Sequence, residues 1–100
     1  PQTIERGGVR IDLMRQRVRV DGADVRLTPA EMRILMLLAD RGGGVVSRQE
    51  IARDLWGSET YDPRTAYVHI SNLRRKIEID PSRPRHVVTV PGLGYRLGEG

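Results

Sequence analysis

The sequence predicts an α+β fold in which an antiparallel sheet is followed by three helices and a C-terminal β-hairpin. Two changes in the spacing of apolar residues carry this prediction. Apolar side chains alternate with polar ones in residues 1–28, recur at helical spacing in residues 29–80, and alternate again in residues 86–98. A chain of 100 residues can close one modest hydrophobic core, so we expect a single domain, 1–100, built from these three parts.

The N-terminal part is predicted to be an antiparallel sheet with one face in water. Residues 9–13 and 17–20 alternate between aliphatic and charged side chains, which is the period of a strand half buried on a core. An Asp-Gly pair after the second run is a hairpin signal, and residues 25–27 continue the pattern beyond it. A glycine pair after residues 3–5 can turn an earlier short strand onto the same sheet.

The first helix is predicted to begin at Pro29. Thr28 can cap it, proline suits the first helical position, and Glu31 can bond back to the amide of the cap. The apolar residues that follow, 32–39, are dense enough to place this helix at the centre of the core. The glycine run at 42–44 ends it.

A second helix is predicted from a second capping-box pattern, Ser47 with Glu50. The residues before it, 45–46, are expected to form a very short strand. Trp56 and Gly57 close this helix, and we interpret Trp56 as a packing residue rather than a ligand platform.

The third helix is predicted to span 63–79, with Asp62 as its N-cap and Asp80-Pro81 as its stop. At about 100° per residue this segment has two distinct faces. The apolar face, an anchor for the core, carries Ala66, Ile70, Leu73 and Ile77. The opposite face carries Arg64, Val68, Ser71, Asn72 and Arg75.

The last part, 86–98, is predicted to be a hairpin that turns at residues 91–94. A helix, a connector and a second amphipathic helix with a polar outer face make a helix-turn-helix, and a basic hairpin after it makes a winged helix-turn-helix. A helix of this kind fits a DNA major groove, and guanidinium, amide, hydroxyl and small apolar groups are the side chains that read base edges there. Ser47 opens the second helix, where its amides and the Arg48 side chain are suited to hold a phosphate.

The charge distribution favours a polyanionic partner. The formal net charge is +4, and sixteen of the seventeen basic residues are arginine, whose planar fork suits phosphate and guanine. Residues 64–96 hold seven basic and two acidic residues, a net charge of +5. A solvated helix surface is the alternative interpretation of the polar face, but the capped helix-turn-helix order and the basic hairpin favour DNA binding.

The composition argues against several other classes of protein. The absence of cysteine excludes disulfides and thiolate zinc sites and favours a cytoplasmic protein. No apolar run reaches the roughly 20 residues of a membrane span, and no leader opens the chain, so we expect no membrane partner and no secretion. Because the chain begins with Pro rather than Met, we expect a piece of a longer protein.

No catalytic constellation is recognisable. The nearest carboxylate pairs border a turn or end a helix, and the glycine run 42–44 lacks a following Lys-Ser or Lys-Thr. His69 and His86 have no cysteine to complete a metal site. We therefore expect no enzyme, no metal, no cofactor and no small-molecule substrate.

Eight short motifs lie in order over nearly the whole chain: LTPAE at 27–31, VSRQE at 46–50, WG at 56–57, RT at 64–65, VHI at 68–70, LRRK at 73–76, TV at 89–90 and GLGYR at 92–96. Together they resemble the DNA-binding domain of OmpR/PhoB-type response regulators. The resemblance implies a four-stranded N-terminal sheet, a three-helix core and a C-terminal wing. It also implies bacterial transcription regulation in a two-component system, downstream of a receiver domain that is phosphorylated by a sensor kinase and is absent from these residues.

The resemblance further implies partners and contact positions. Two copies are expected to bind head-to-tail on direct repeats in double-stranded DNA, and the loop 57–62 resembles the segment that touches RNA polymerase in activators of the family. The family's DNA-contacting positions on the recognition helix match Arg64, Val68, His69, Ser71, Asn72 and Arg74. Its wing positions match Thr89 and Tyr95.

Two positions depart from the family pattern. Tyr67 stands where the family often has an acidic residue, and Pro91 stands where its wing commonly carries an arginine. The absence of that charge argues against insertion of the wing into the minor groove, and Arg96 or Arg85 is the alternative phosphate contact. A protein–protein interaction module is the second hypothesis. Such a module needs an exposed apolar side chain on the third helix to anchor its partner. Val68 is available there, with Tyr67 beside it. RNA binding is less favoured because exposed aromatic residues are scarce.

Overall fold

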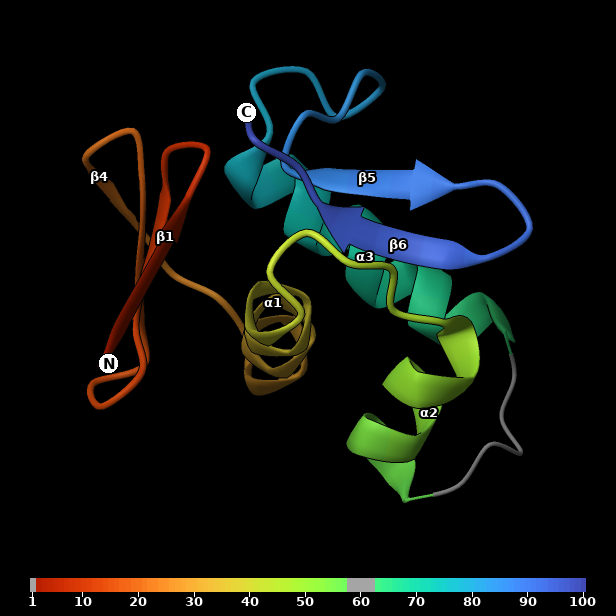
Figure 1. Cartoon of the computed structure of the whole chain (residues 1–100). Coiled ribbons are helices and arrows are strands. Elements are labelled where there is room, and N and C mark those ends of the chain that lie inside the picture. Colours follow the sequence, from red (N-terminus) through yellow and green to blue (C-terminus); the bar gives the residue numbers. More distant parts are fainter. Residues whose placement is uncertain (1, 58–62) are drawn as a thin grey trace.

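A computed structural model describes residues 2–57 and 63–100 and confirms the predicted α+β architecture (Figure 1). The strands of the N-terminal sheet are β1 (Thr3–Arg6), β2 (Val9–Asp12), β3 (Arg17–Val20) and β4 (Ala23–Val25). The helices are α1 (Pro29–Asp40), α2 (Arg48–Trp56) and α3 (Pro63–Ile77). The C-terminal hairpin is formed by β5 (Val87–Val90) and β6 (Gly94–Leu97).

The N-terminal sheet is antiparallel with its strands in chain order, β1-β2-β3-β4. Val9, Ile11 and Val18 point to one face and are buried, whereas the charged residues between them are on the exposed face. The predicted hairpin between β3 and β4 is a two-residue turn, in which Asp21 (φ 49°) and Gly22 (φ 85°) are both left-handed. This is the turn whose twist matches that of the two flanking strands.

Both predicted capping boxes are present. The Thr28 hydroxyl accepts from the Glu31 amide at 3.2 Å, and the Glu31 carboxylate accepts from the Thr28 amide at 2.9 Å. Ser47 and Glu50 exchange the equivalent bonds at 3.1 and 3.0 Å. The start of α1 and the start of α2 are therefore each set by a pair of side chains three residues apart.

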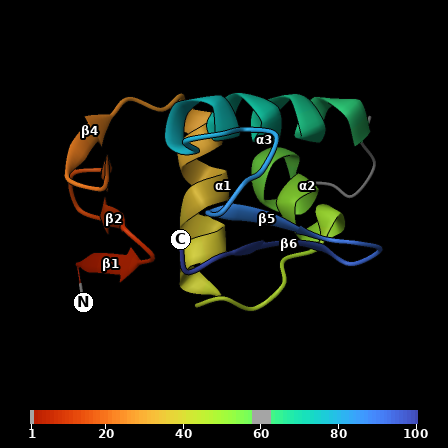
Figure 2. The same ribbon diagram turned by 90° about the horizontal axis from the view of Figure 1, so that it is seen from above.

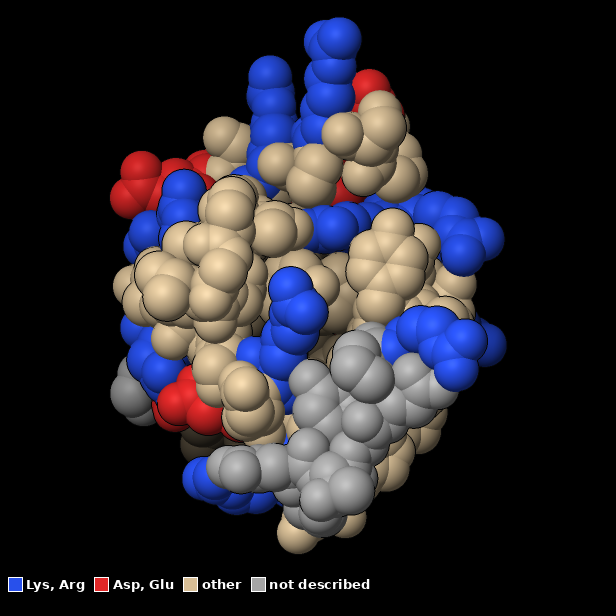
Figure 3. Space-filling model, turned by 90° about the vertical axis from the view of Figure 1, so that its right-hand side faces the viewer, with Lys and Arg blue, Asp and Glu red and all other residues tan. Residues whose placement is uncertain are grey.

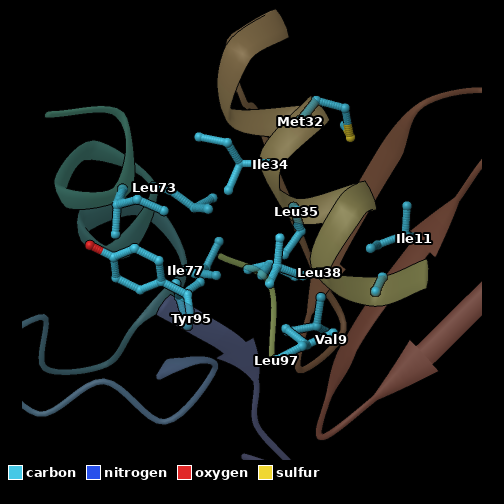
Figure 4. Close-up of a cluster of buried hydrophobic side chains, with 14 of the residues drawn as sticks. Val9, Ile11, Met32, Ile34, Leu35, Leu38, Leu73, Ile77, Tyr95 and Leu97 are labelled. Atoms are coloured by element: carbon cyan, nitrogen blue, oxygen red, sulfur yellow. The ribbon is translucent and has the colours of Figure 1, made fainter. Parts of the chain in front are cut away.

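The core is centred on α1, which lies between the N-terminal sheet on one side and α2, α3 and the hairpin on the other (Figures 1 and 2). Leu35 and Leu38 of α1 are fully buried. They belong to a cluster that also receives Ile11 from β2, Leu73 from α3 and Leu97 from β6 (Figure 4). One hydrophobic core thus unites all three parts of the chain.

The strand expected at 45–46 is reduced to a single bridging residue. Val46 pairs with Tyr95: its amide donates to the Tyr95 carbonyl at 2.7 Å, and its carbonyl accepts from the Tyr95 amide at 2.9 Å. The neighbouring Gly94 is required by this close approach, because its φ is 147° and an added Cβ would overlap the Val46 carbonyl oxygen. The bridge fastens β6 to the segment that enters α2.

The prediction that the third helix extends to residue 79 was wrong by two residues: α3 ends at Ile77. The amide of Glu78 still donates to the Arg74 carbonyl at 2.9 Å, but its side chain turns back to the start of β5. The Glu78 carboxylate accepts from the amides of Arg85, His86 and Val87 at 2.8–3.1 Å. Asp62, the predicted N-cap of this helix, lies outside the described residues.

Candidate nucleic-acid interface

The two faces of α3 are arranged as the sequence predicts. The apolar residues of the inner face, Ala66, Ile70, Leu73 and Ile77, are all buried. On the outer face, Arg64 and Arg75 are exposed, Val68 is 51% exposed, and Ser71 and Asn72 are half-buried. The helix is therefore held by one face and presents two guanidiniums, an amide and a small apolar group on the other.

Asn72 and Arg75 form a linked pair on this outer face. The Arg75 guanidinium donates to the Asn72 side-chain oxygen at 2.7 Å. Residues three apart on a helix are neighbours, so the bond holds both polar groups at one place on the surface. Sequence spacing put the two residues on one face, and the structure brings them into contact.

Arg74, predicted as a DNA contact, is half-buried between α3 and the hairpin. Its guanidinium donates to the Val87 carbonyl at 2.9 and 3.0 Å and to the Thr89 hydroxyl at 2.8 Å. The guanidinium carbon lies 5.6 Å from the centre of the Tyr95 ring. Tyr95 is 8% exposed and packs the hairpin onto the helices, as expected (Figure 4).

The remaining predicted positions lie on the hairpin and at the start of α2. Thr89 is exposed on β5, Arg96 is half-buried on β6, and Pro91 is exposed at the turn between these strands. The Ser47 hydroxyl is engaged as the cap of α2, and Arg48 beside it is exposed. The Ser47 amide, followed by Arg41, lowers the pKa of Glu50 below its ordinary value, so the carboxyl of this capping box is ionised at neutral pH.

His69 lies on the flank of α3 next to α2. Its ring centroid is 6.3 Å from that of Trp56, which is 42% exposed at the end of α2. Within residues 2–57 and 63–100, no group of three or more His, Cys, Asp or Glu residues is placed to hold a metal ion. In the same described ranges, no helix has the length and apolar character needed to cross a membrane.

The structural roles of two residues, Lys76 and Glu78, were not recognised from the sequence. Lys76, counted among the cations of the basic segment, donates to Glu31 at 2.5 Å, and Glu31 is 1% exposed. Glu78 holds the start of β5, as described above. The Lys76 contact joins residues 45 positions apart, and the Glu78 contacts reach 7 to 9 positions ahead, beyond the spacing that a helix or strand pattern specifies.

Basic side chains outnumber acidic ones on the side of the molecule where the hairpin turns (Figure 3). Figure 3 shows the side of the molecule that lies at the right of Figure 1, with Lys and Arg side chains projecting from its upper part and its edge. Asp and Glu are fewer on this face.

Comparison with known proteins identifies the family. The family model described as "Transcriptional regulatory protein, C terminal" matches residues 22–97. The transcriptional regulatory protein KdpE of Mycobacterium tuberculosis is 43% identical over 96 residues, which are 94% of this chain and 42% of KdpE. This chain therefore spans less than half the length of that relative.

Two solved structures share the fold. The response regulator DrrB of Thermotoga maritima, an OmpR/PhoB homolog, matches 97% of this chain and 44% of its own with a TM-score of 0.87 and 32% identity. The RstA DNA-binding domain of Klebsiella pneumoniae, solved in complex with the RstA box, matches over 100% of both chains with a TM-score of 0.87 and 31% identity. On the family match, the relative and the shared fold together, this chain belongs to the transcriptional regulatory protein C-terminal family, the OmpR/PhoB-type winged-helix domains of response regulators.

Proposed function

We propose that this chain is the effector domain of a bacterial two-component response regulator and binds double-stranded DNA in a sequence-specific manner to control transcription. The observation that carries the proposal is α3, which is anchored by a buried apolar face and presents Arg64, Val68, Asn72 and Arg75 outward. The similar RstA domain, solved with its DNA box, supports it.

The physical match is with the major groove. An α-helix about 10–12 Å across fits a groove about 12 Å wide, where arginine reads guanine, asparagine reads base edges and small apolar groups meet thymine methyls. Backbone contacts would then position the helix and add affinity. For base contacts we propose Arg64, Val68, Asn72 and Arg75. For contacts along the flanks and to the backbone we propose His69, Ser71, Ser47, Arg48, Thr89, Tyr95 and Arg96.

We propose that the full-length protein contains a receiver domain and binds DNA as two copies. This chain acts as one domain, and a receiver domain in the rest of the protein controls it. Two copies bind head-to-tail on direct repeats, and the loop 57–62, most of which lies outside the described residues, contacts RNA polymerase. We propose no catalytic activity for this domain, and a cytoplasmic location because bacterial DNA is there.

Selection of bound duplexes from a random pool tests the proposal. Enrichment of direct repeats about one helical turn apart is expected for tandem binding. On the recovered duplex, Arg64→Ala and Arg75→Ala should each weaken binding by roughly 1–3 kcal/mol, measured by fluorescence anisotropy against a scrambled duplex. If wild type and both variants bound the two duplexes equally, α3 would not be the recognition helix.

One observation favours a second function. Tyr67 is 58% exposed and Val68 51% exposed, next to one another on α3, and together they offer an apolar anchor for a protein partner. In that case Tyr67→Ala would abolish partner capture, while no duplex would be enriched in the selection. Enrichment of a duplex whose binding depends on Arg64 and Arg75 decides against this alternative.

A further inference from the structure

We propose that Arg74 is a positioning residue, which holds the hairpin at a fixed place beside α3 and turns the Thr89 hydroxyl outward as a donor to a DNA phosphate. The inference rests on the proposed function and assigns Arg74 this role in place of a direct DNA contact. Its basis is the set of bonds that the Arg74 guanidinium makes within the protein.

The Arg74 guanidinium is largely occupied by the hairpin. Of its five N–H groups, the one on Nε donates to the Val87 carbonyl, and Nη2 donates to the same carbonyl and to the Thr89 hydroxyl, at 2.8–3.0 Å. The guanidinium also lies over the Tyr95 ring, 5.6 Å from its centre, within the range of a cation–π contact. One side chain of α3 thus binds both strands of the hairpin.

These contacts fix the distance between the two parts of the interface. The hairpin runs beside α3 (Figure 2), and its base is held by buried Val87 and Leu97. The bridge between Val46 and Tyr95 holds β6, the strand whose Tyr95 pairs with Thr89, on the other side from α3's bond to β5. Thr89 lies farther along β5 toward the turn, and its hydroxyl is linked to α3 by the bond that it accepts from Arg74. Arg74 is also next in sequence to Arg75, so its bonds to Val87 and Thr89 hold the hairpin close to the outer face of α3.

The bond to Thr89 decides what that hydroxyl can offer to DNA. A threonine hydroxyl has one O–H donor and two acceptor lone pairs. Because its oxygen accepts a charge-assisted bond from Arg74, its proton remains available, and that bond polarises the O–H. Thr89 is exposed, and a hydroxyl donor is suited to a phosphate oxygen.

Lysine separates this role from a direct phosphate contact. A lysine ammonium binds phosphate as a point charge, but it lacks the planar fork that reaches Val87 and Thr89 together. If Arg74 holds the hairpin, Arg74→Lys and Arg74→Met should weaken binding to the selected duplex alike, by about tenfold. In both variants the slope of log affinity against log salt should stay at the wild-type value, because the contact that is lost, from the neutral Thr89 hydroxyl, neutralises no phosphate charge.

A direct phosphate contact gives the opposite pattern. Arg74→Lys would then bind nearly as wild type, and Arg74→Met would reduce the salt slope by about 0.9. Either result overturns the proposal. Arg48→Met, at a proposed phosphate contact, is the control that shows the slope responding.

Two further measurements keep the proposal testable if the Arg74 variants bind poorly for other reasons. In the free chain, amide hydrogen exchange of β5 should speed up in Arg74→Lys while α1 keeps its protection. Thr89→Val should weaken binding in the wild type but have little further effect in Arg74→Lys, whereas Thr89→Ser should bind as wild type. Unchanged exchange in β5, or additive effects of the two substitutions, would overturn the inference. If wild type enriches no duplex, the proposed function fails, and the exchange result still decides whether Arg74 holds the hairpin.

Discussion

Lys76 and Glu31 join α3 to the first turn of α1. Glu31 is 1% exposed, and its carboxylate accepts from Lys76 at 2.5 Å and from the Thr28 amide at 2.9 Å. Burial acts to raise the pKa of this carboxyl, but the hydrogen bonds from Lys76 and Thr28 outweigh burial and lower the pKa below its ordinary value of 4.5. Glu31 is therefore charged at neutral pH, and Lys76 supplies its bonded cation.

Replacing Lys76 with Met should lower the free energy of unfolding at neutral pH by roughly 1–3 kcal/mol, because the buried carboxylate loses its charged partner. Urea denaturation measures the change. The matched control is Arg10→Met, which breaks a 3.8 Å ion pair with Glu5 between two exposed side chains. That control should cost less than about 1 kcal/mol. Equal losses in the two variants would show that the Lys76 contact contributes no more than an ordinary surface pair.

The same pair predicts a pH dependence. A carboxyl whose pKa is lowered by folding stabilises the fold above its unfolded-state pKa, and this stabilisation is lost as pH falls through the folded-state pKa. The stability difference between wild type and Lys76→Met should therefore narrow as pH falls below the ordinary value of 4.5 for Glu31. Urea denaturation of both proteins over this acid range measures the narrowing, and a constant difference would assign the effect to packing of the lysine stem.

At the scale of elements, side chains that bond to backbone amides decide where helices and strands begin. The Glu78 carboxylate ends α3 and starts β5 by accepting three amides from residues 85–87. Thr28 and Ser47 do the same for the first turns of α1 and α2. The orientation of the hairpin relative to α3 thus depends on Glu78 at its base and on Arg74, which bonds to Val87 at the base and to Thr89 farther along β5.

Ser47 has a structural role and a proposed functional one, and two substitutions separate them. Asp and Asn are both good N-caps, so Ser47→Asp and Ser47→Asn should keep the free energy of unfolding within about 1 kcal/mol of wild type. Only the aspartate places a negative charge beside Arg48, where we propose a DNA phosphate. Binding to the selected duplex should therefore fall by about tenfold in Ser47→Asp and stay near wild type in Ser47→Asn. Equal affinities, measured at low salt, would remove the phosphate from the start of α2.

For the whole molecule, the sequence predicted the helices and strands, because these depend on the local spacing of apolar and capping residues. Period two, helical spacing and the two capping boxes predicted the order of the helices and strands that the structure describes, because each signal lies within a few residues of the structure that it specifies. The bounds were less exact: β4 covers Ala23–Val25 rather than 25–27, and α3 ends at Ile77. The contacts of Arg74 and Lys76 were not predictable in this way. They join residues 13 to 45 positions apart, and helical spacing places a side chain on a flank without showing what packs across from it.

The position of each charge, rather than the net charge, should control DNA binding by the whole molecule. Arg17 is exposed on β3, in the sheet that lies on the far side of α1 from the hairpin, whereas Arg64 is exposed on α3 (Figure 1). Arg17→Gln and Arg64→Gln each lower the net charge of +4 by one. Exposed charges are screened beyond about 8 Å at physiological salt, so Arg17→Gln should change affinity by less than about twofold. Arg64→Gln should weaken binding at least about fivefold. Anisotropy titrations on the selected duplex measure both, and equal losses would mean that overall charge, not the recognition face of α3, governs the interaction.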